Sequence, residues 1–430
     1  MSNFQLPRGM RDIMPEEMVK REYVYQKIKE VLKNCGFSLL EASTLESLET
    51  LVAKSGELIK NEVYWFKDKA ERDVGLRFDL TVGLARIVAT NPELVKPLRL
   101  ASISNMFRYD EPQFARYRCF YQWDAEVFGC EGVLADAEVI SVTCSILESL
   151  GLNEYEVKIS NRKLIEGLLV ESGIPESKIP QVLRFVDKLA KLDEKGKRGE
   201  MEKLGLNEKQ FGVILDLSKQ GGSFRNVLKS FKEIKNEKVE KGLKELEDLA
   251  SALEAYGKLK NCVVDLGIVR GIDYYTGIVF EVYDLKSKDL GAIAGGGRFD
   301  DLVGMYGKET PATGIAGGIE RLLLSLERSK LLPEIRVSPK FFVIPVSESV
   351  KYKAISIAQE IRNLGISCEV DLLNKKLGKQ MEYCDKKSIP YALILGEKEL
   401  LENKIKVKNM KSGEEKFLSI DRLEELRSLP

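Results

Sequence analysis

The 430-residue chain contains no histidine. This absence excludes every mechanism that needs an imidazole from the protein, including a Ser-His-Asp triad, a Cys-His dyad and a histidine-ligated metal. Its seven cysteines are scattered without a CxxC pair, so a disulfide framework is not expected and the thiols should be reduced. Any chemistry must therefore depend on carboxylates, arginines, tyrosines, backbone groups and a hard cation.

Long apolar runs are also absent. No segment approaches the roughly 18 consecutive apolar residues that a membrane helix requires. The N-terminal segment, residues 1–12, lacks the apolar centre of a secretory signal. Together with the unpaired thiols, these features predict a cytoplasmic protein without a membrane partner.

A strong net charge is missing as well, because 67 Lys and Arg balance 67 Asp and Glu. The chain as a whole is therefore not expected to attract nucleic acid by charge alone. From Arg336 onward, however, 18 basic residues stand against 14 acidic residues. This excess favours a polyanionic partner for the C-terminal segment, although a solvated lysine-rich surface explains it equally well.

The length predicts about three domains at roughly 150 residues each. Mixed helix and strand signals in residues 1–169 and 259–332 indicate one core that is interrupted in sequence. Residues 170–258 are rich in Lys and Glu with heptad-like apolar spacing, which predicts a helical insertion. Residues 338–430 alternate strand, helix and strand, which predicts an α/β domain with parallel strands.

The segment FRYDEPQFARYRCFYQWDAEVFG, residues 107–129, contains the first site-like pattern. Its second half alternates apolar and polar residues, so it predicts a strand that forms a hairpin with a strand at residues 98–110. The polar face carries Arg116, Arg118, Phe120, Gln122, Asp124 and Glu126. Arginine suits planar, bidentate contacts with phosphate or carboxylate, so we expect this face to meet a ligand; a solvent-exposed face is the alternative.

A second pattern is VRGIDYYTGIVFE, residues 269–281, which crowds Arg270, Asp273, Tyr274 and Tyr275 against glycines. The alternative to a site is a hairpin turn whose tyrosines pack in the core. Further along, Gly295–Gly297 precede an arginine, which indicates either an anion-binding nest or a tight turn.

A third arginine, Arg321, falls in the first turn of a helix predicted by GGIERLL. The free backbone N–H groups of a helix start make this a candidate anion site. Each pattern alone is weak, and the order in which they follow one another along the chain carries more information.

That order is similar to the motif order of the histidyl-tRNA synthetase family, which belongs to class II. PRGMRDIMPEE (7–17) resembles the N-terminal opening of the family, and LRFDLT (76–81) resembles its amino-acid-binding segment. The hairpin segment resembles the second class II motif, and ATGIAGGIERLLL resembles the third. VRGIDYYTGIVFE resembles the histidine-specific signature, and KKLGKQMEYCDKKSIPYALILGEKEL resembles the anticodon-binding domain.

The resemblance implies an α+β catalytic core with an antiparallel sheet, a helical insertion and a C-terminal α/β anticodon-binding domain. The catalytic core would comprise residues 1–169 and 259–332, the insertion residues 170–258 and the anticodon-binding domain residues 338–430. The implied activity joins histidine to ATP, with Mg²⁺, to give histidyl-adenylate and pyrophosphate. The resemblance further implies that histidine would then be transferred to the 3′ end of tRNA(His), and that the enzyme would be a homodimer.

The resemblance also implies a role for each site residue. The residues implied for catalysis are Arg108 and Arg270. The residues implied for histidine binding are Asp79, Thr81, Gln122, Glu126, Tyr274 and Tyr275. The residues implied for ATP binding are Arg108, Arg116, Phe120 and Arg321, whereas Glu111 and Gln113 would face the acceptor end of the tRNA. No residue is implied as a metal ligand.

This sequence departs from the family pattern at several positions. Ser43 stands in place of the first-motif proline, which lies at the family's dimer interface. Tyr109 and Tyr121 replace histidines that are common in the second motif. Ala115 replaces a glycine, and Glu111 stands where a basic residue is frequent.

Two other classes of function remain open from the sequence. One is the non-catalytic regulatory subunit of ATP phosphoribosyltransferase, which resembles the synthetase core but typically lacks the last domain and the signature residues. The other is an RNA-binding or sensor module without turnover. The zero histidine count also allows the hypothesis that the message can be translated during histidine starvation, with chance composition as the alternative.

Overall fold

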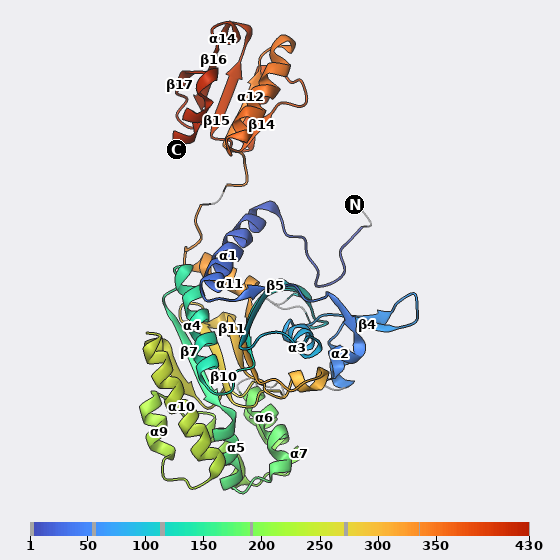
Figure 1. Cartoon of the computed structure of the whole chain (residues 1–430), viewed down its shortest axis with the longest axis vertical. Coiled ribbons are helices and arrows are strands. Elements are labelled where there is room, and N and C mark those ends of the chain that lie inside the picture. The colour runs from blue at the N-terminus through green and yellow to red at the C-terminus, as the bar shows by residue number, and fades with distance from the viewer. Residues whose placement is uncertain are drawn as a thin grey trace. The chain divides into compact units, whose positions relative to one another are not determined.

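The computed structural model describes residues 4–53, 57–111, 117–189, 192–270, 274–334 and 336–429. The chain divides into two compact units, Met1–Pro333 and Glu334–Pro430 (Figure 1). Residues 170–258 belong to the same unit as the residues before and after them. Within the described ranges, no helix is both long and apolar enough to cross a lipid bilayer.

A large sheet organises the first unit. Its described strands, in spatial order, are β1 (Ser38–Leu39), β5 (Leu98–Phe107), β6 (Cys119–Phe128), β12 (Ala312–Gly318), β11 (Ala294–Arg298), β10 (Ile278–Asp284), β7 (Tyr155–Asn161), β9 (Cys262–Asp265) and β8 (Gly221–Gly222). The pairs β1–β5 and β7–β9 are parallel, and the other pairs among these strands are antiparallel. The prediction of an antiparallel core is confirmed.

The two faces of this sheet have different roles. Odd-numbered side chains of β6, such as Trp123 and Ala125, pack in the main core with three helices. These helices are α1 (Pro15–Asn34), α4 (Leu134–Ser149) and α11 (Ile319–Arg328). Helix α3 (Thr81–Thr90) packs with the even-numbered Phe128 on the other face. The strict alternation in the sequence therefore separates a helix-covered face from the face that carries the site.

A small sheet and a short helix hold the segment that leads into α3. The small sheet contains β2 (Leu45–Ser47), β4 (Asp73–Leu76) and β3 (Trp65–Lys67), and α2 (Leu48–Val52) follows β2. Arg77, directly after β4, is buried and donates to the backbone oxygens of Asn105 at 2.9 Å and Ala42 at 2.6 Å. These bonds tie the start of α3 to the end of β5.

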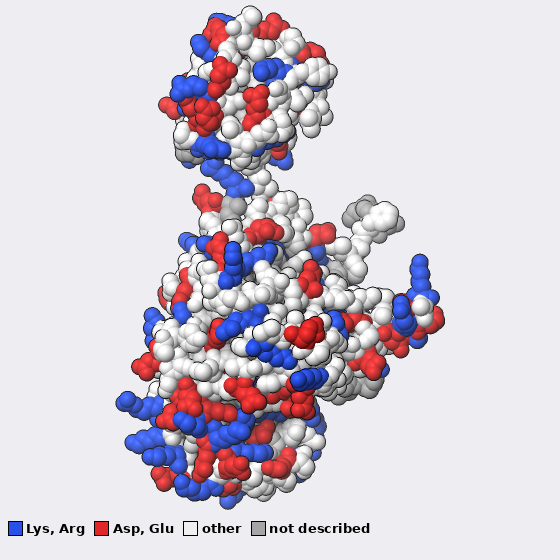
Figure 2. Space-filling model, viewed as in Figure 1, with Lys and Arg blue, Asp and Glu red and all other residues white. Residues whose placement is uncertain are grey.

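The segment predicted as a helical insertion is helical in the structure. Its helices and the one that leads into it are α5 (Arg162–Glu171), α6 (Ile179–Lys188), α7 (Glu194–Lys203), α8 (Glu208–Leu217), α9 (Phe224–Phe231) and α10 (Glu237–Ala255). Acidic and basic side chains alternate over these helices (Figure 2), as expected for a solvated surface. The short strand β8 also lies here and pairs with β9 at the edge of the large sheet, which the sequence did not predict.

The second unit contains a five-stranded sheet within its described residues. The strands, in spatial order, are β14 (Cys368–Val370), β13 (Phe341–Pro345), β15 (Tyr391–Leu395), β16 (Lys404–Asn409) and β17 (Glu415–Ser419). The helices are α12 (Lys351–Asn363), α13 (Leu377–Lys386) and α14 (Glu397–Leu401). The predicted parallel strands are confirmed as β13, β14 and β15, whereas the antiparallel pair β16–β17 was missed.

Candidate active site

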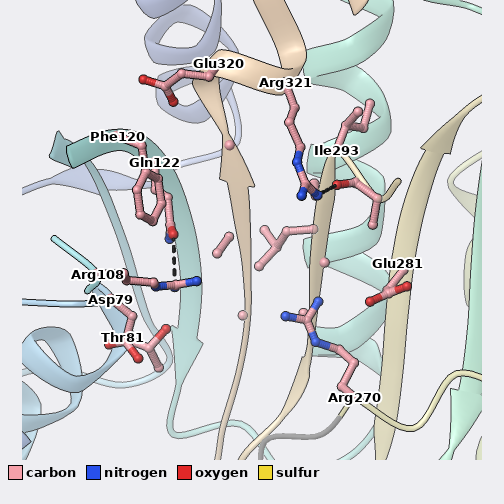
Figure 3. Close-up of a pocket in the computed structure, with 18 of the residues that line it drawn as sticks. Asp79, Thr81, Arg108, Phe120, Gln122, Arg270, Glu281, Ile293, Glu320 and Arg321 are labelled. Atoms are coloured by element: carbon pink, nitrogen blue, oxygen red, sulfur yellow. Dashed lines mark hydrogen bonds between the residues drawn. The ribbon is translucent and has the colours of Figure 1, made fainter. Parts of the chain in front are cut away.

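A pocket of about 340 Å³ lies on the sheet face that carries the even-numbered side chains of β6 (Figure 3). Segments that are far apart in the sequence meet there: the start of α3, the end of β5, strands β6, β10, β11 and β12, and the first turn of α11. The predicted site residues that line it are Asp79, Thr81, Arg108, Phe120, Gln122, Arg270, Tyr274, Tyr275 and Arg321. The fold thus brings together nine of the residues that the sequence singled out.

Small residues form the floor of this pocket. Gly295 of β11 lies opposite Ala316 of β12 in the ladder, and both line the cavity. A Cβ atom on Gly295 would lie 1.8 Å from Nη1 of Arg270, so only glycine leaves room for that guanidinium. Gly295–Gly297 are therefore part of a strand, and both alternatives from the sequence, a nest and a tight turn, were wrong.

Three arginines reach the pocket from different segments. Arg108 follows β5; its Nε donates to the backbone oxygen of Phe78 at 2.9 Å, and Nη2 donates to Oε1 of Gln122 at 3.3 Å. Arg321 donates from Nη1 to the backbone oxygen of Ala292 at 2.7 Å. Arg270 enters from the opposite wall to Arg108 (Figure 3). Their positive charges converge on one cavity, as two anionic reactants would require.

The backbone of Arg270 has an unusual conformation. Its φ of 46° lies in the left-handed region, which a side chain other than Gly, Asn or Asp seldom adopts. Burial alone would lower the pKa of its guanidinium, but the nearby Tyr275 and Glu281 groups raise the pKa above its ordinary value. The arginine is therefore held as a cation, with its charge centre 5.5 Å from the Tyr275 ring centroid.

Two carboxylic acids, Asp124 and Glu126, lie side by side on the even face of β6, with 0% and 1% of their surface exposed. Burial and the negative charge of Asp79 raise the pKa of Asp124 well above its ordinary value. Burial and the charge of Asp124 do the same to the pKa of Glu126. The Thr81 side chain is close enough to offset part of the rise in the pKa of Glu126, but neither Oε atom of Glu126 has a partner with good hydrogen-bond geometry among the described residues. This end of the site therefore contains acceptors that a ligand N–H could satisfy.

Tyr274 and Tyr275 form an aromatic wall next to these acids. Their ring centroids are 4.7 Å apart, and the ring of Tyr274 meets that of Phe299 edge-on at 5.9 Å. Burial is the largest factor that raises the pKa of both phenols, so both remain protonated and can donate a hydrogen bond.

Asp79 and Thr81 are placed by the start of α3. Oδ1 of Asp79 accepts the backbone N–H of Val82 at 3.0 Å, which satisfies one free donor of the helix. The Arg77 bonds described above hold the preceding residues, so the position of Asp79 follows from the fold.

Some predicted residues lie outside the pocket surface. Glu126 lies beside the cavity rather than on its lining, under Gly314. Arg118 does not line the pocket. It lies one residue before the start of β6, and its Nε donates to the backbone oxygen of Asp110 at 3.0 Å. Glu111 pairs with Arg8 at 2.8 Å on the surface.

Four residues discussed from the sequence, Gln113, Ala115, Arg116 and Asp273, lie outside the described residues. The structure also adds side chains that the sequence did not single out, since Asp110, Tyr117, Glu281 and Glu320 line the pocket. Asp124, which the alternation placed on the polar face without a role in the site, lies beneath the pocket. The polar positions in the β6 and β10 alternation were the available signals for Asp124 and Glu281. Glu320 also binds the backbone N–H of Tyr121 at 3.1 Å and so joins α11 to β6.

Metal ligands do not gather in the described part of the chain, where no group of three or more Cys, Asp or Glu side chains could hold an ion. A cation that arrives with phosphates needs few protein ligands, because Mg²⁺ retains water and phosphate oxygens.

Residues 9–322 match the family described as histidyl-tRNA synthetase. The chain belongs to this family. Residues 340–426 match the family described as the anticodon binding domain. Among curated relatives, the histidine–tRNA ligase of Thermococcus kodakarensis is 37% identical, and the alignment covers 98% of both chains. That of Pyrococcus furiosus is 38% identical over 96% of both chains.

Solved structures give the same result. The histidyl-tRNA synthetase from Nostoc sp. PCC 7120 superimposes with a TM-score of 0.84 at 30% identity, and all of both chains is covered. A protein from Bacillus halodurans described as an ATP phosphoribosyltransferase regulatory subunit/histidyl-tRNA synthetase gives a TM-score of 0.75 at 26% identity. That match covers 89% of this chain and 97% of the other.

Proposed function

We propose that the protein is an ATP-dependent histidine–tRNA ligase, which forms histidyl-adenylate and then transfers histidine to the 3′ end of tRNA(His). The convergence of Arg108, Arg270 and Arg321 on one pocket carries this proposal. Family membership supports the choice of histidine and tRNA as substrates.

In the first step, a carboxylate oxygen of histidine attacks the α-phosphorus of ATP, and pyrophosphate leaves. The carboxylate is already ionised near neutral pH, so the step needs no general base, which suits a protein without histidine. The main obstacle is the approach of two anions. Arg108 and Arg270 face the cavity from opposite sides and would stabilise the negative charge that develops between them (Figure 3).

ATP would lie along the arginine-rich side of the pocket. Phe120 would stack on the adenine, and Arg321 and Arg116 would contact the phosphates. Mg²⁺ would be held by the phosphate oxygens and water, and would neutralise part of their charge. We assign no residue of the chain as its ligand.

Selection of histidine would occur at the buried end of the site. Asp79 and Thr81 would bind the α-amino group, while Gln122, Glu126, Tyr274 and Tyr275 would surround the imidazole. An imidazole N–H would satisfy an acceptor of Glu126 that otherwise has none among the described residues. An apolar amino acid would leave this acceptor unsatisfied, so discrimination should be large and editing unnecessary.

In the second step, a ribose hydroxyl of the terminal adenosine attacks the carbonyl carbon of the adenylate, and AMP leaves. Glu111 and Gln113 would lie near the acceptor end, and the anticodon-binding domain would contact the anticodon. We further propose a homodimer in the cytoplasm, as the resemblance implies, although Ser43 replaces the proline expected in the first motif.

Histidine-dependent exchange of pyrophosphate into ATP tests the first step. The folded protein should catalyse exchange with histidine, and exchange with other amino acids should be far slower. Charging of tRNA(His) tests the second step. A folded, ATP-binding protein that shows no exchange would contradict the proposal.

The second candidate is a non-catalytic regulatory subunit, because the Bacillus halodurans relative carries both descriptions. Two observations weigh against it: residues 340–426 form an anticodon-binding domain, and Arg270 is present in the pocket. A regulator would bind histidine without exchange and would change the rate of ATP phosphoribosyltransferase.

A further inference from the structure

Asp124 is a completely buried carboxylic acid in the middle of β6, beneath the pocket. Its Oδ1 accepts a hydrogen bond from Nε2 of Gln122 at 3.4 Å. Oε1 of Gln122 in turn accepts the bond from Arg108 at 3.3 Å (Figure 3). A line of three polar side chains thus runs from the pocket into the interior of the sheet.

The direction of this line follows from the chemistry of each group. A guanidinium only donates hydrogen bonds, whereas a primary amide has one donor end and one acceptor end. Gln122 must therefore turn its oxygen toward Arg108, because a flipped amide would place N–H groups against N–H groups. A carboxyl oxygen at the other end of the amide favours the orientation that is observed.

We propose that Asp124 is a positioning residue that fixes the orientation of the Gln122 amide and, through it, the direction of the Arg108 guanidinium. The proposal rests on the function proposed above for Arg108. Asp124 does not line the cavity, so it acts through its neighbour rather than on the substrate.

Ser102 provides a matched control. It lies directly opposite Asp124 in the β5–β6 ladder and is also completely buried. Its hydroxyl has no hydrogen-bond partner among the described residues. Ser102→Ala therefore changes a buried polar group at the same depth of the sheet without touching the line of bonds.

Substitutions at Asp124 distinguish positioning from a purely structural role. Asp124→Leu removes the acceptor and should lower kcat of histidine-dependent exchange about tenfold or more, since small misplacements of a catalytic group are costly. Asp124→Asn keeps a carbonyl oxygen and should remain within about threefold of the original chain, as should Ser102→Ala. The Asp124→Leu, Gln122→Ala double variant should be no slower than Gln122→Ala alone.

A compensating pair keeps the proposal testable if Asp124→Leu does not fold. Gln122→Glu replaces the amide donor by a second acid and should lower kcat. Adding Asp124→Asn restores an N–H for that acid, so part of the rate should return. If the pair is as slow as Gln122→Glu alone, the proposal is overturned.

NMR of ¹⁵N-labelled glutamine side chains provides a readout without turnover. The Gln122 signal, identified by its loss in Gln122→Ala, should exchange slowly with solvent in the original chain and in Asp124→Asn, and faster in Asp124→Leu. The Gln122 amide could exchange slowly with solvent in a protein that shows no histidine-dependent pyrophosphate exchange. That result would refute the proposed ligase function but support the positioning of Gln122. An unchanged amide signal in folded Asp124→Leu, an unchanged kcat, or additive losses in the double variant would each overturn the inference.

Discussion

Replacing Arg270 by alanine removes one of the two guanidinium groups that face each other across the pocket (Figure 3). Loss of one preorganised donor to developing negative charge costs roughly 3 kcal/mol, which corresponds to about a hundredfold or more in rate. The cost should appear mainly in kcat of the exchange reaction, because the charge that Arg270 stabilises develops during attack on the α-phosphate.

The fold should survive this substitution. The side chain lies over Gly295 rather than between packed apolar groups, and the left-handed backbone of Arg270 adds strain that alanine shares. We therefore expect a melting temperature within a few degrees of that of the original chain.

The assay is histidine-dependent ATP–pyrophosphate exchange, with the folded fraction measured by circular dichroism. Arg270→Lys serves as a comparison, since it keeps the charge but loses the planar, multiple donors of the guanidinium. It should recover only part of the rate. If Arg270→Ala unfolds, or if its folded fraction exchanges at the original rate, Arg270 has a structural role and the site is misassigned.

Three further predictions concern Gly295 in the pocket floor and two buried residues outside the pocket lining, Arg298 and Glu126. Gly295→Ala should lower the exchange rate as much as Arg270→Ala does, because the new Cβ displaces the guanidinium; combining the two should add no further loss. Arg298→Met should lower the free energy of unfolding in urea by about 3–5 kcal/mol, because it leaves the buried Asp136 without its cation, while kcat per folded molecule stays unchanged. Glu126→Gln should increase thermal stability at pH 8 but not at pH 4. The raised pKa means that the folded state holds a proton that the unfolded state releases, so this acid destabilises the fold as the pH rises above its ordinary pKa. A melting temperature of Glu126→Gln that tracks the original chain across this range would contradict that reasoning.

The alternation in residues 116–127 was enough to predict β6 and the face that carries Phe120 and Gln122. It could not separate Arg118, which lies just before the strand and bonds to loop backbone, from the residues that line the pocket. The difference depends on where hydrogen bonding with β5 ends, which is a long-range property. Similarly, Glu126 is buried because Gly314, far along the chain, leaves space above its side chain.

The glycines before Arg298 show the same limit. Glycine permits a turn, a nest or a strand, so local sequence leaves the choice open. Pairing with β10 on one side and β12 on the other decides it, and those partners lie outside the local window. The antiparallel strands β16 and β17 were missed although β16 alternates lysine with Ile405 and Val407, because two apolar residues are a short signal. Pairing along one edge of the sheet stabilises both strands.

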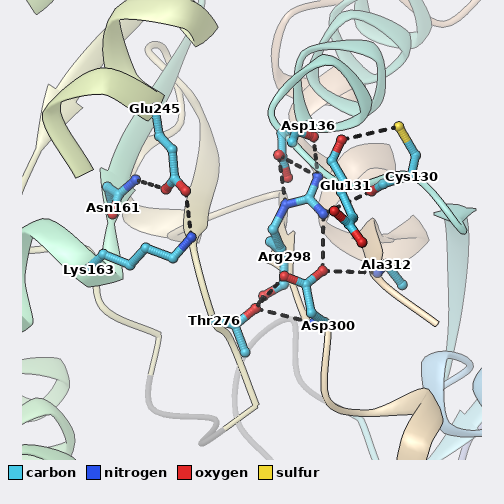
Figure 4. A network of polar contacts seen from close by, with 11 residues as sticks. Cys130, Glu131, Asp136, Asn161, Lys163, Glu245, Thr276, Arg298, Asp300 and Ala312 are labelled. Atoms are coloured by element: carbon cyan, nitrogen blue, oxygen red, sulfur yellow. Dashed lines mark hydrogen bonds and ion pairs between the residues drawn. The ribbon is translucent and has the colours of Figure 1, made fainter. Parts of the chain in front are cut away.

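The number of satisfied donors separates the buried Arg298 from the partly buried Arg108. Arg298 uses all five of its N–H groups, which bond to Asp136, Asp300 and the backbone oxygens of Cys130 and Gly132 (Figure 4). Within the described residues, Arg108 uses two, and its remaining donors are left for a ligand in the cavity. Both arginines follow or end a strand and both are charged, so residue type and local pattern cannot distinguish them. A guanidinium whose N–H groups are all hydrogen-bonded within the protein stabilises the fold. A guanidinium that presents unused N–H groups to a cavity can bind an anion.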